Sequence, residues 1–255
     1  MREVALLTAA GGDGLATVVD VLTGTQITSL KNCSAQPGST ALIAGDFVAS
    51  AQVKGTAVHF WAWGSEQPRL KCHAPEKLGP LAVSDDGWLC AGGGLSGRVY
   101  LWEVASGALL HAWDAHYKAV SALAFSPDGC FLYSGGEDAM VSAWNMLAAV
   151  DPEGGAGFKG GGAGTSSSSG GGRHSSFPTT WTASQHSLPV TGIFAAKGGG
   201  RVYTCSLDRT ARVWDSGSGR LLLSATCPVF LRTVTADPAE TFLFAAGGGG
   251  VIYQV

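Results

Sequence analysis

Short apolar stretches recur along the whole chain, separated by turns rich in glycine, serine and aspartate. Clear examples lie at residues 4–9, 16–21, 26–30 and 120–125. None approaches the roughly 20 apolar residues of a membrane-spanning helix. Stretches of this length, with valine and aromatic residues alternating with polar ones, are typical of β-strands. The pattern therefore predicts an all-β protein.

A longer spacing groups the strands into four-stranded repeats. The position expected to close the third strand of each repeat recurs at intervals of 42, 41, 42, 70 and 40 residues, at Val19, Trp61, Trp102, Trp144, Trp214 and Gln254. Four of these five intervals match the period of about 40–45 residues of a β-propeller blade, and the fifth is longer by one insertion. The spacing predicts a propeller with about six visible blades.

Turn residues agree with this register. Four-residue turns between the first two strands of a blade are expected to begin at Ile43, Ser84, Ser126, Ala196 and Ala236. The second blade should then run over about residues 40–72, the third over 79–113, the fifth over 190–225, and the sixth from about residue 231 onward. The outer strand of the fourth blade is expected near Thr179.

The repeat register divides the chain into three parts. Residues 1–150 are expected to hold blades one to four, and residues 178–255 the end of blade four, blade five and a partial blade six. Between them, residues 151–177 are dominated by glycine and serine, which bury too little apolar surface to offset the cost of ordering, so a flexible insertion is predicted.

The two ends of the repeat array are expected to be incomplete. The first blade lacks residues for an innermost strand, and the sixth lacks an outer one. Six blades could close through a mixed terminal sheet, but an incomplete seven-bladed ring is the favoured interpretation.

Two blades carry the same residues at the same spacing, namely His116, Ser134, Asp138 and Trp144 in one and His186, Thr204, Asp208 and Trp214 in the other. Carboxylate, imidazole, hydroxyl and indole can form one buried hydrogen-bonded chain in which every polar group has a partner. We interpret the two sets as structural tetrads. A catalytic Ser-His-Asp triad is the alternative, but a catalytic set would occur once, whereas this one recurs with serine replaced by threonine.

Composition narrows the possible functions. The net charge of −3 excludes a strong overall attraction to nucleic acid, although a local basic patch could still bind RNA or an acidic partner, with Arg201, Arg209, Arg212, Arg220 and Arg232 as candidates. Solvated turn and outer-strand arginines are the favoured interpretation. Charged residues make up only 14% of the chain, against about 25% in typical soluble domains, which fits a surface covered by partners.

The chain contains no signal for a cofactor or metal. Its six cysteines form no C-x-x-C pair, so we interpret them as free thiols in a reducing compartment and not as a zinc site or a disulfide framework. No Gly-Lys-Ser/Thr sequence follows the glycine clusters, which argues against a phosphate-binding loop. Residues 1–10 weakly resemble a secretory leader, but the first strand of the repeat explains them better.

Several segments resemble a known family. These are residues 99–107 (Val-Tyr-Leu-Trp-Glu-Val-Ala-Ser-Gly), 116–123, 134–138, 186–191 (His-Ser-Leu-Pro-Val-Thr), 205–214 and 248–255 (Gly-Gly-Gly-Val-Ile-Tyr-Gln-Val). They are similar to the WD-repeat propeller of the Ipi-three family, whose animal member is called WD-repeat protein eighteen. Family members continue through a further blade and a helical tail, and from the resemblance we expect neither in this chain.

The resemblance implies a non-enzymatic scaffold in the nucleus and nucleolus. It further implies work with the other Rix-complex subunits and a giant dynein-like ATPase on pre-large-subunit ribosomal particles, in processing of the second internal transcribed spacer of pre-rRNA. From the residues themselves, a generic WD-repeat adaptor remains the alternative, such as a ubiquitin-ligase substrate receptor or a signalling or replication-licensing platform, and an orphan hydrolase is the least favoured.

Overall fold

The computed structural model describes residues 4–8, 16–31, 33, 38–43, 47–52, 55–62, 65–147 and 177–254. Within these ranges the protein consists of antiparallel β-sheets of three or four strands, which we number as blades one to six in chain order. The predicted all-β fold is confirmed. The predicted insertion, apart from Phe177, lies outside the described residues.

The first three blades occupy the N-terminal half of the chain. Blade one joins β1 (Val4–Thr8), β2 (Ala16–Asp20) and β3 (Gln26–Leu30). Blade two joins β4 (Thr40–Ile43), β5 (Phe47–Ala51), β6 (Ala57–Ala62) and β7 (Leu70–His73), and blade three joins β8 (Leu78–Val83), β9 (Leu89–Gly94), β10 (Arg98–Glu103) and β11 (Leu109–Asp114).

The other three blades follow in the same order. Blade four joins β12 (Val120–Phe125), β13 (Phe131–Gly136), β14 (Val141–Asn145) and β15 (Thr179–Ala183). Blade five joins β16 (Val190–Ala195), β17 (Arg201–Ser206), β18 (Thr210–Asp215) and β19 (Leu221–Thr226), and blade six joins β20 (Leu231–Ala236), β21 (Leu243–Gly247) and β22 (Ile252–Gln254). The four strands predicted with both ends, and the predicted limits of blades two, three and five, agree with these bounds to within one residue.

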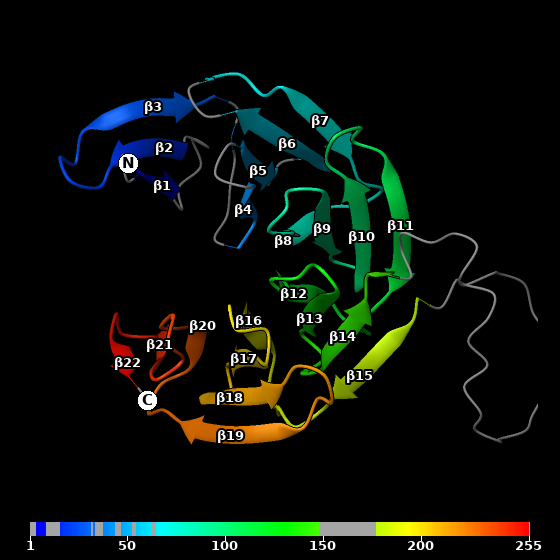
Figure 1. Ribbon diagram of the computed structural model, residues 1–255, viewed down its shortest axis with the longest axis vertical. Coiled ribbons are helices and arrows are strands. Elements are labelled where there is room, and N and C mark those ends of the chain that lie inside the picture. The colour runs from blue at the N-terminus through cyan, green and yellow to red at the C-terminus, as the bar shows by residue number, and fades with distance from the viewer. Residues whose placement is uncertain are drawn as a thin grey trace, which may run out of the picture.

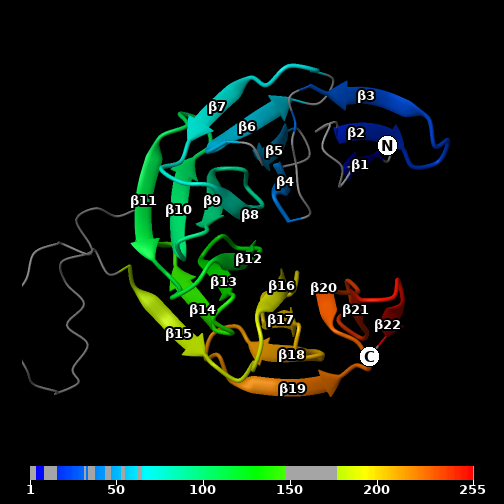
Figure 2. The ribbon, with the colours of Figure 1, turned by 180° about the vertical axis from the view of Figure 1, so that it is seen from behind.

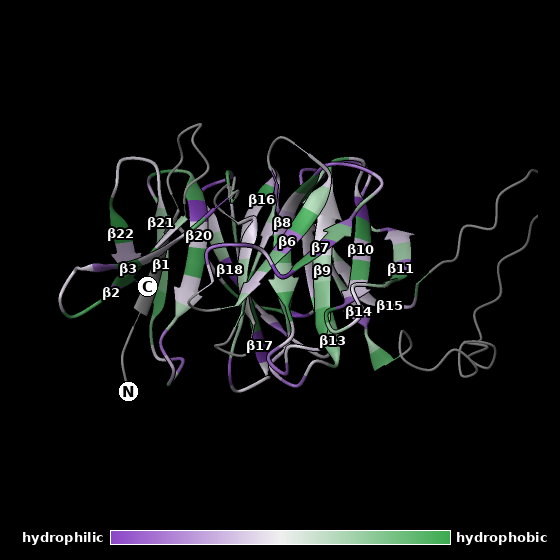
Figure 3. Cartoon of the chain, turned by 90° about the horizontal axis from the view of Figure 1, so that it is seen from above, coloured by the Kyte–Doolittle hydropathy of each residue, from purple (hydrophilic) through white to green (hydrophobic). Residues whose placement is uncertain are grey.

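The six blades follow one another around a central axis (Figure 1). Strands β4, β8, β12, β16 and β20 lie innermost, each beside the next, while β3, β7, β11, β15 and β19 lie on the outer rim. The view from behind shows blades one and six on either side of an opening in the ring (Figure 2), and no ladder of the described residues joins them. Seen from above, the strands cross the thickness of the ring and the turns gather on its two faces (Figure 3).

Apolar cores lie between neighbouring blades. Trp102 packs on blade two, Trp144 on blade three and Trp214 on blade four, each within a cluster of buried side chains from both blades. These tryptophans are at most 5% exposed. Truncating a fully buried tryptophan typically costs about 3–5 kcal/mol, so the repeated tryptophan is a principal contact between successive sheets.

A β-bulge recurs beside the same position in four blades. The pairing of the last two strands of the blade shifts immediately before Val19, Trp102, Trp144 and Trp214. A bulge bends the strand and increases its twist. The backbone geometry therefore repeats together with the residue type, and the predicted spacing is confirmed at these four positions.

Three of the predicted turns are confirmed, since the N–H groups of Gly87, Gly129 and Gly199 bond the carbonyl groups of Ser84, Ser126 and Ala196. Residues 44–46 of the turn at Ile43 lie outside the described residues.

The turn predicted at Ala236 is wrong by one residue. The observed turn runs from Asp237 to Glu240, closed by a 2.9 Å bond from the Glu240 N–H to the Asp237 carbonyl. This register puts Pro238 second in the turn, where its fixed φ is favoured. Phe244 pairs with Gln254, so Gln254 lies one residue before the position that Trp144 and Trp214 hold. The position predicted to end the third strand of blade six, Gln254, is therefore also one residue too early.

Candidate functional site

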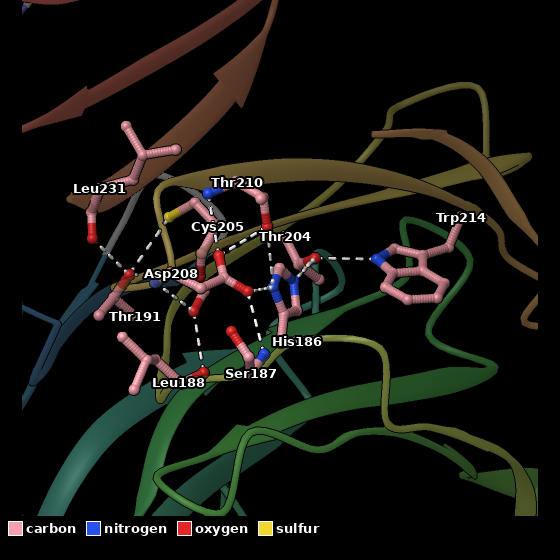
Figure 4. A network of polar contacts seen from close by, with 11 residues as sticks. His186, Ser187, Leu188, Thr191, Thr204, Cys205, Asp208, Thr210, Trp214 and Leu231 are labelled. Carbon is pink, nitrogen blue, oxygen red and sulfur yellow. Dashed lines mark hydrogen bonds and ion pairs between the residues drawn. The ribbon is translucent and has the colours of Figure 1, made fainter. Parts of the chain in front are cut away.

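The best-defined polar constellation is the tetrad of blade five (Figure 4). His186, in the link between β15 and β16, bonds Asp208 Oδ2 through Nδ1 at 2.9 Å and Thr204 Oγ1 through Nε2 at 2.8 Å. The Trp214 indole N–H donates to the same Thr204 oxygen at 2.8 Å. The four predicted residues therefore form a continuous chain from the turn after β17 into the core.

Asp208 also organises the backbone around the tetrad. Its Oδ2 accepts from the Ser187 N–H at 3.1 Å, and its Oδ1 accepts from the Thr210 N–H at 2.9 Å and from the Thr210 hydroxyl at 2.6 Å. One carboxylate thus fixes the link that enters blade five to the turn between its second and third strands.

Blade four repeats the arrangement. His116 Nδ1 lies 3.0 Å from Asp138 Oδ1, and its Nε2 lies 2.8 Å from Ser134 Oγ. The Trp144 N–H donates to Ser134 Oγ at 2.9 Å, and the Tyr117 N–H donates to Asp138 Oδ2 at 3.0 Å. The structure brings all eight predicted tetrad residues together in two sets with the same connectivity.

The pKa values of the blade-five pair follow from burial and hydrogen bonding. Burial alone would raise the pKa of Asp208, but bonds from the Thr210 hydroxyl, the His186 ring and two backbone N–H groups lower it to about 2. Burial lowers the pKa of His186, and Asp208 only partly opposes that effect. At neutral pH a neutral His186 donates to Asp208 through Nδ1 and accepts the Thr204 hydroxyl proton at Nε2.

The arrangement suits a structural link better than catalysis. The side chains of Ser134 and Thr204 are fully buried, at 0% exposure, and each hydroxyl oxygen already accepts an indole N–H. A nucleophile must reach a substrate carbonyl beside an oxyanion hole, which a hydroxyl sealed between strands does not do.

In blade three the link before the first strand and the turn after the second strand are also joined by hydrogen bonds, but through different residues, which sequence reasoning missed. Glu76, in the link before β8, accepts from the Ser96 N–H at 2.9 Å and from the Tyr100 hydroxyl at 2.8 Å. Here the link supplies the carboxylate and the turn supplies the Ser96 N–H and hydroxyl, whereas in blades four and five the turn supplies the carboxylate and the link supplies the histidine. Ser96 holds the position before Trp102 that Asp138 and Asp208 hold before their tryptophans, but the histidine position is Ala74 and Glu76 lies off the tetrad spacing, so the cluster could not be found by searching for the tetrad.

Hydroxyl groups also connect neighbouring blades, another feature that the sequence did not reveal. Thr191, on the inner strand of blade five, donates to the Leu231 carbonyl of blade six at 2.8 Å. Ser121 donates in the same way from blade four to the Val190 carbonyl of blade five. Both residues stand at a bulge in the inner strand, directly after the buried Val190 or Val120. A hydroxyl residue after that valine was the only available signal.

The five arginines of the predicted basic patch are not gathered on one surface. Arg209 lies in the turn between β17 and β18, and Arg220 in the turn at the opposite end of β18. Arg201 pairs with Glu240 at 3.6 Å, and Arg232 lies on the inner strand β20 with its guanidinium 5.5 Å from the centre of the Phe230 ring. Arg212 has its Nε and Nη1 atoms buried within blade five.

A cavity of about 540 Å³ lies along the central axis, because its lining comes from the innermost strands of blades two to six. Its polar lining includes Thr40, Thr233 and Arg232.

Cys72, Cys90, Cys130, Cys205 and Cys227 are free thiols, and burial raises the pKa of Cys72, Cys205 and Cys227. Within the described ranges no group of three or more His, Cys, Asp or Glu side chains is placed to hold a metal ion. Nor does that part of the chain contain a helix with the length and apolar character to cross a membrane.

The family described as "WD domain, G-beta repeat" matches residues 107–145 and 178–215, the two segments that contain all eight tetrad residues of blades four and five. Together with six propeller blades and two complete His-Ser/Thr-Asp-Trp networks, this match defines the class. The chain belongs to the WD-repeat family of β-propeller proteins.

Particular relatives extend the similarity to nearly the whole chain. Pre-rRNA-processing protein IPI3 of Yarrowia lipolytica is 34% identical and covers 100% of this chain, which in turn spans 56% of that protein. WD repeat-containing protein 18 of Bos taurus is 32% identical, covering 99% of this chain and 55% of its own length. Protein ROOT INITIATION DEFECTIVE 3 of Arabidopsis thaliana is 28% identical, with 92% and 51% covered. The chain thus spans about half the length of these relatives.

Proposed function

We propose that this chain is a non-catalytic scaffold in pre-rRNA processing. The observation that carries the proposal is similarity over the whole chain to a protein named for pre-rRNA processing. The buried tetrads support it, because they hold the links and turns at the blade ends in one geometry and their own hydroxyl groups are buried away from any substrate. A rigid ring that presents fixed loops suits binding to other proteins.

At a finer level, we propose that the chain acts on pre-large-subunit ribosomal particles in the nucleolus and nucleoplasm. Its partners would be Rix-complex subunits and a giant dynein-like ATPase, and the process would be removal of the second internal transcribed spacer. The family resemblance supports these assignments. The dispersed arginines give no support to a dedicated RNA surface, so the proposal is one of protein contacts.

Affinity purification from the source cells tests this proposal against a generic adaptor role. Tagged protein should recover large-subunit precursors, Rix-complex subunits and the giant ATPase, as identified by mass spectrometry. A tagged unrelated WD-repeat protein of similar abundance is the control. Recovery of a cullin-linked or signalling set without pre-ribosomal proteins would contradict the proposal and favour the adaptor.

A further inference from the structure

A second cavity, of about 250 Å³, opens between blades five and six. Its apolar lining comes from the second, third and fourth strands of blade five and the start of β21, chiefly Tyr203, Val213, Leu222, Leu223, Phe242 and Leu243. Leu222, Leu223 and Phe242 remain 42%, 51% and 49% exposed. Large apolar side chains half open to solvent around one cavity are typical of a binding surface.

The preceding junction shows what fills the same place one blade earlier. Leu223 pairs with Val213 in blade five, and Trp181 pairs with Ala143 at the same register in blade four. Trp181 is 9% exposed and its indole N–H donates to the Ser216 carbonyl at 2.8 Å. An indole therefore closes the junction between blades four and five, where the next junction has a half-exposed leucine.

An aromatic ring also fills the outer part of the junction between blades three and four. Phe177 stacks on Trp113 with the ring centroids 4.2 Å apart and the planes inclined by 15°. Two successive junctions are thus closed by aromatic side chains. The third keeps a cavity large enough for one such ring.

A charged group at the cavity adds a second property that a bound ligand should match. Arg201 is half exposed there, and its ion pair with Glu240 is long at 3.6 Å. Glu240 Oε2 also accepts the Tyr203 hydroxyl at 3.2 Å. Since Arg201 shares its acid with Tyr203, its guanidinium keeps donors for a further carboxylate.

We propose that this cavity binds an aromatic side chain of a partner protein, in a segment that also carries an acidic residue. The ring fills the space between Leu223 and Phe242, and the carboxylate pairs with Arg201. The inference adds a partner chemistry to the proposed scaffold function, but it rests on the cavity and not on pre-rRNA processing. Either one can fail while the other holds.

Ligand-observed NMR with the purified chain and short peptides tests the aromatic requirement. The probe is acetyl-Gly-Asp-Trp-Gly-amide, compared with the same peptide carrying alanine in place of tryptophan or asparagine in place of aspartate. The tryptophan peptide should bind at least about tenfold more tightly than the alanine peptide, the size of effect expected of a buried anchor residue. Equal affinity would overturn the proposal.

Two substitutions locate the binding. Leu223→Trp places in the cavity the residue that fills it one blade earlier, so peptide binding should be lost while the fold is kept. Leu110→Trp, at an exposed leucine of β11, is the matched control and should bind as the unaltered chain does. Arg201→Ala should remove the preference for aspartate over asparagine. Full binding by Leu223→Trp would contradict the assignment, as would concentration-dependent dimers that Leu223→Trp abolishes, which would identify a second copy as the occupant.

Discussion

Asp208 and Asp138 each accept several hydrogen bonds inside the protein, so removing either carboxylate leaves buried donors unpaired. We expect Asp208→Ala and Asp138→Ala each to lower the free energy of unfolding by about 1–3 kcal/mol. Urea denaturation followed by tryptophan fluorescence measures the change, with Asp85→Ala at an exposed turn position as the control. If the three variants shared one midpoint, the structural role of the tetrads would be refuted.

The pKa shifts of the blade-five pair predict loss of stability in acid. Both folded-state pKa values are lowered, from 6.5 for His186 and from 3.8 for Asp208. The unfolded chain therefore binds more protons than the folded one within each window, and stability falls as the pH falls. The His186 contribution should be complete above about pH 6.5 and decline below it. The Asp208 contribution should decline between about 3.8 and about 2.

Melting temperatures measured from pH 8 downward check this sign. Thr204→Val keeps the size of the side chain and removes the hydroxyl bonded to His186 Nε2, which should change the decline below about pH 6.5. Stability that rises on acidification from neutral pH would contradict the neutral, buried histidine.

The residues of the tetrads could be identified from the sequence because two copies share one spacing. His116 and His186 stand at equal distances from their partners, so repetition itself carried the signal. The Glu76 cluster of blade three could not be identified in this way, since its carboxylate lies on the link instead of in the turn and no histidine takes part. The Thr191 contact joins residues 40 positions apart, which is visible only once the blades are placed side by side.

Hydroxyl groups on the inner strands β12 and β16 link each of these strands to the inner strand of the next blade. Thr191→Val keeps the shape of the side chain and removes the bond to the Leu231 carbonyl, so we expect a loss of about 0.5–1.5 kcal/mol. Amide exchange in β20 should also become faster than in β12. Thr235→Val, at an exposed position of β20, serves as the control. Unchanged stability and exchange in Thr191→Val would show that the contact does not couple the blades.

The turn between the third and fourth strands of blade five requires glycine for two reasons. Gly219 has φ of +68°, and an added Cβ would lie 2.5 Å from the Trp181 ring. Gly199 has φ of +73° but open space around it. Gly199→Ala should therefore cost about 1–2 kcal/mol from backbone strain alone, and Gly219→Ala distinctly more. Thermal denaturation of the two variants decides the point, and equal losses would mean that Trp181 can move aside.

Most strands were predictable because valine and tryptophan recur at regular spacing and the turns carry glycine or aspartate. The turn predicted at Ala236 was wrong because a constant spacing from Gln254 was assumed. The position of Pro238 is the better guide to where this turn begins. Pro238 favours the second position of a turn, and that preference outweighs the spacing.

At the scale of the whole molecule, the spacing predicted how many blades the chain forms but not how they meet. Contacts between blades depend on which aromatic side chain fills each junction, and Trp181 and Leu223 occupy equivalent positions with opposite consequences. The cavity between blades five and six follows from that difference. An aromatic side chain of a partner, bound in this cavity, would hold a flexible partner segment at one defined place on the ring.

Depletion of this protein, followed by hybridisation of RNA with a probe for the second internal transcribed spacer, tests the proposed role most directly. We predict that spacer-containing precursors of the large-subunit rRNA accumulate, and that re-expression of the unaltered protein restores normal levels. Unchanged precursor levels after depletion to undetectable protein would contradict a scaffold role in pre-rRNA processing.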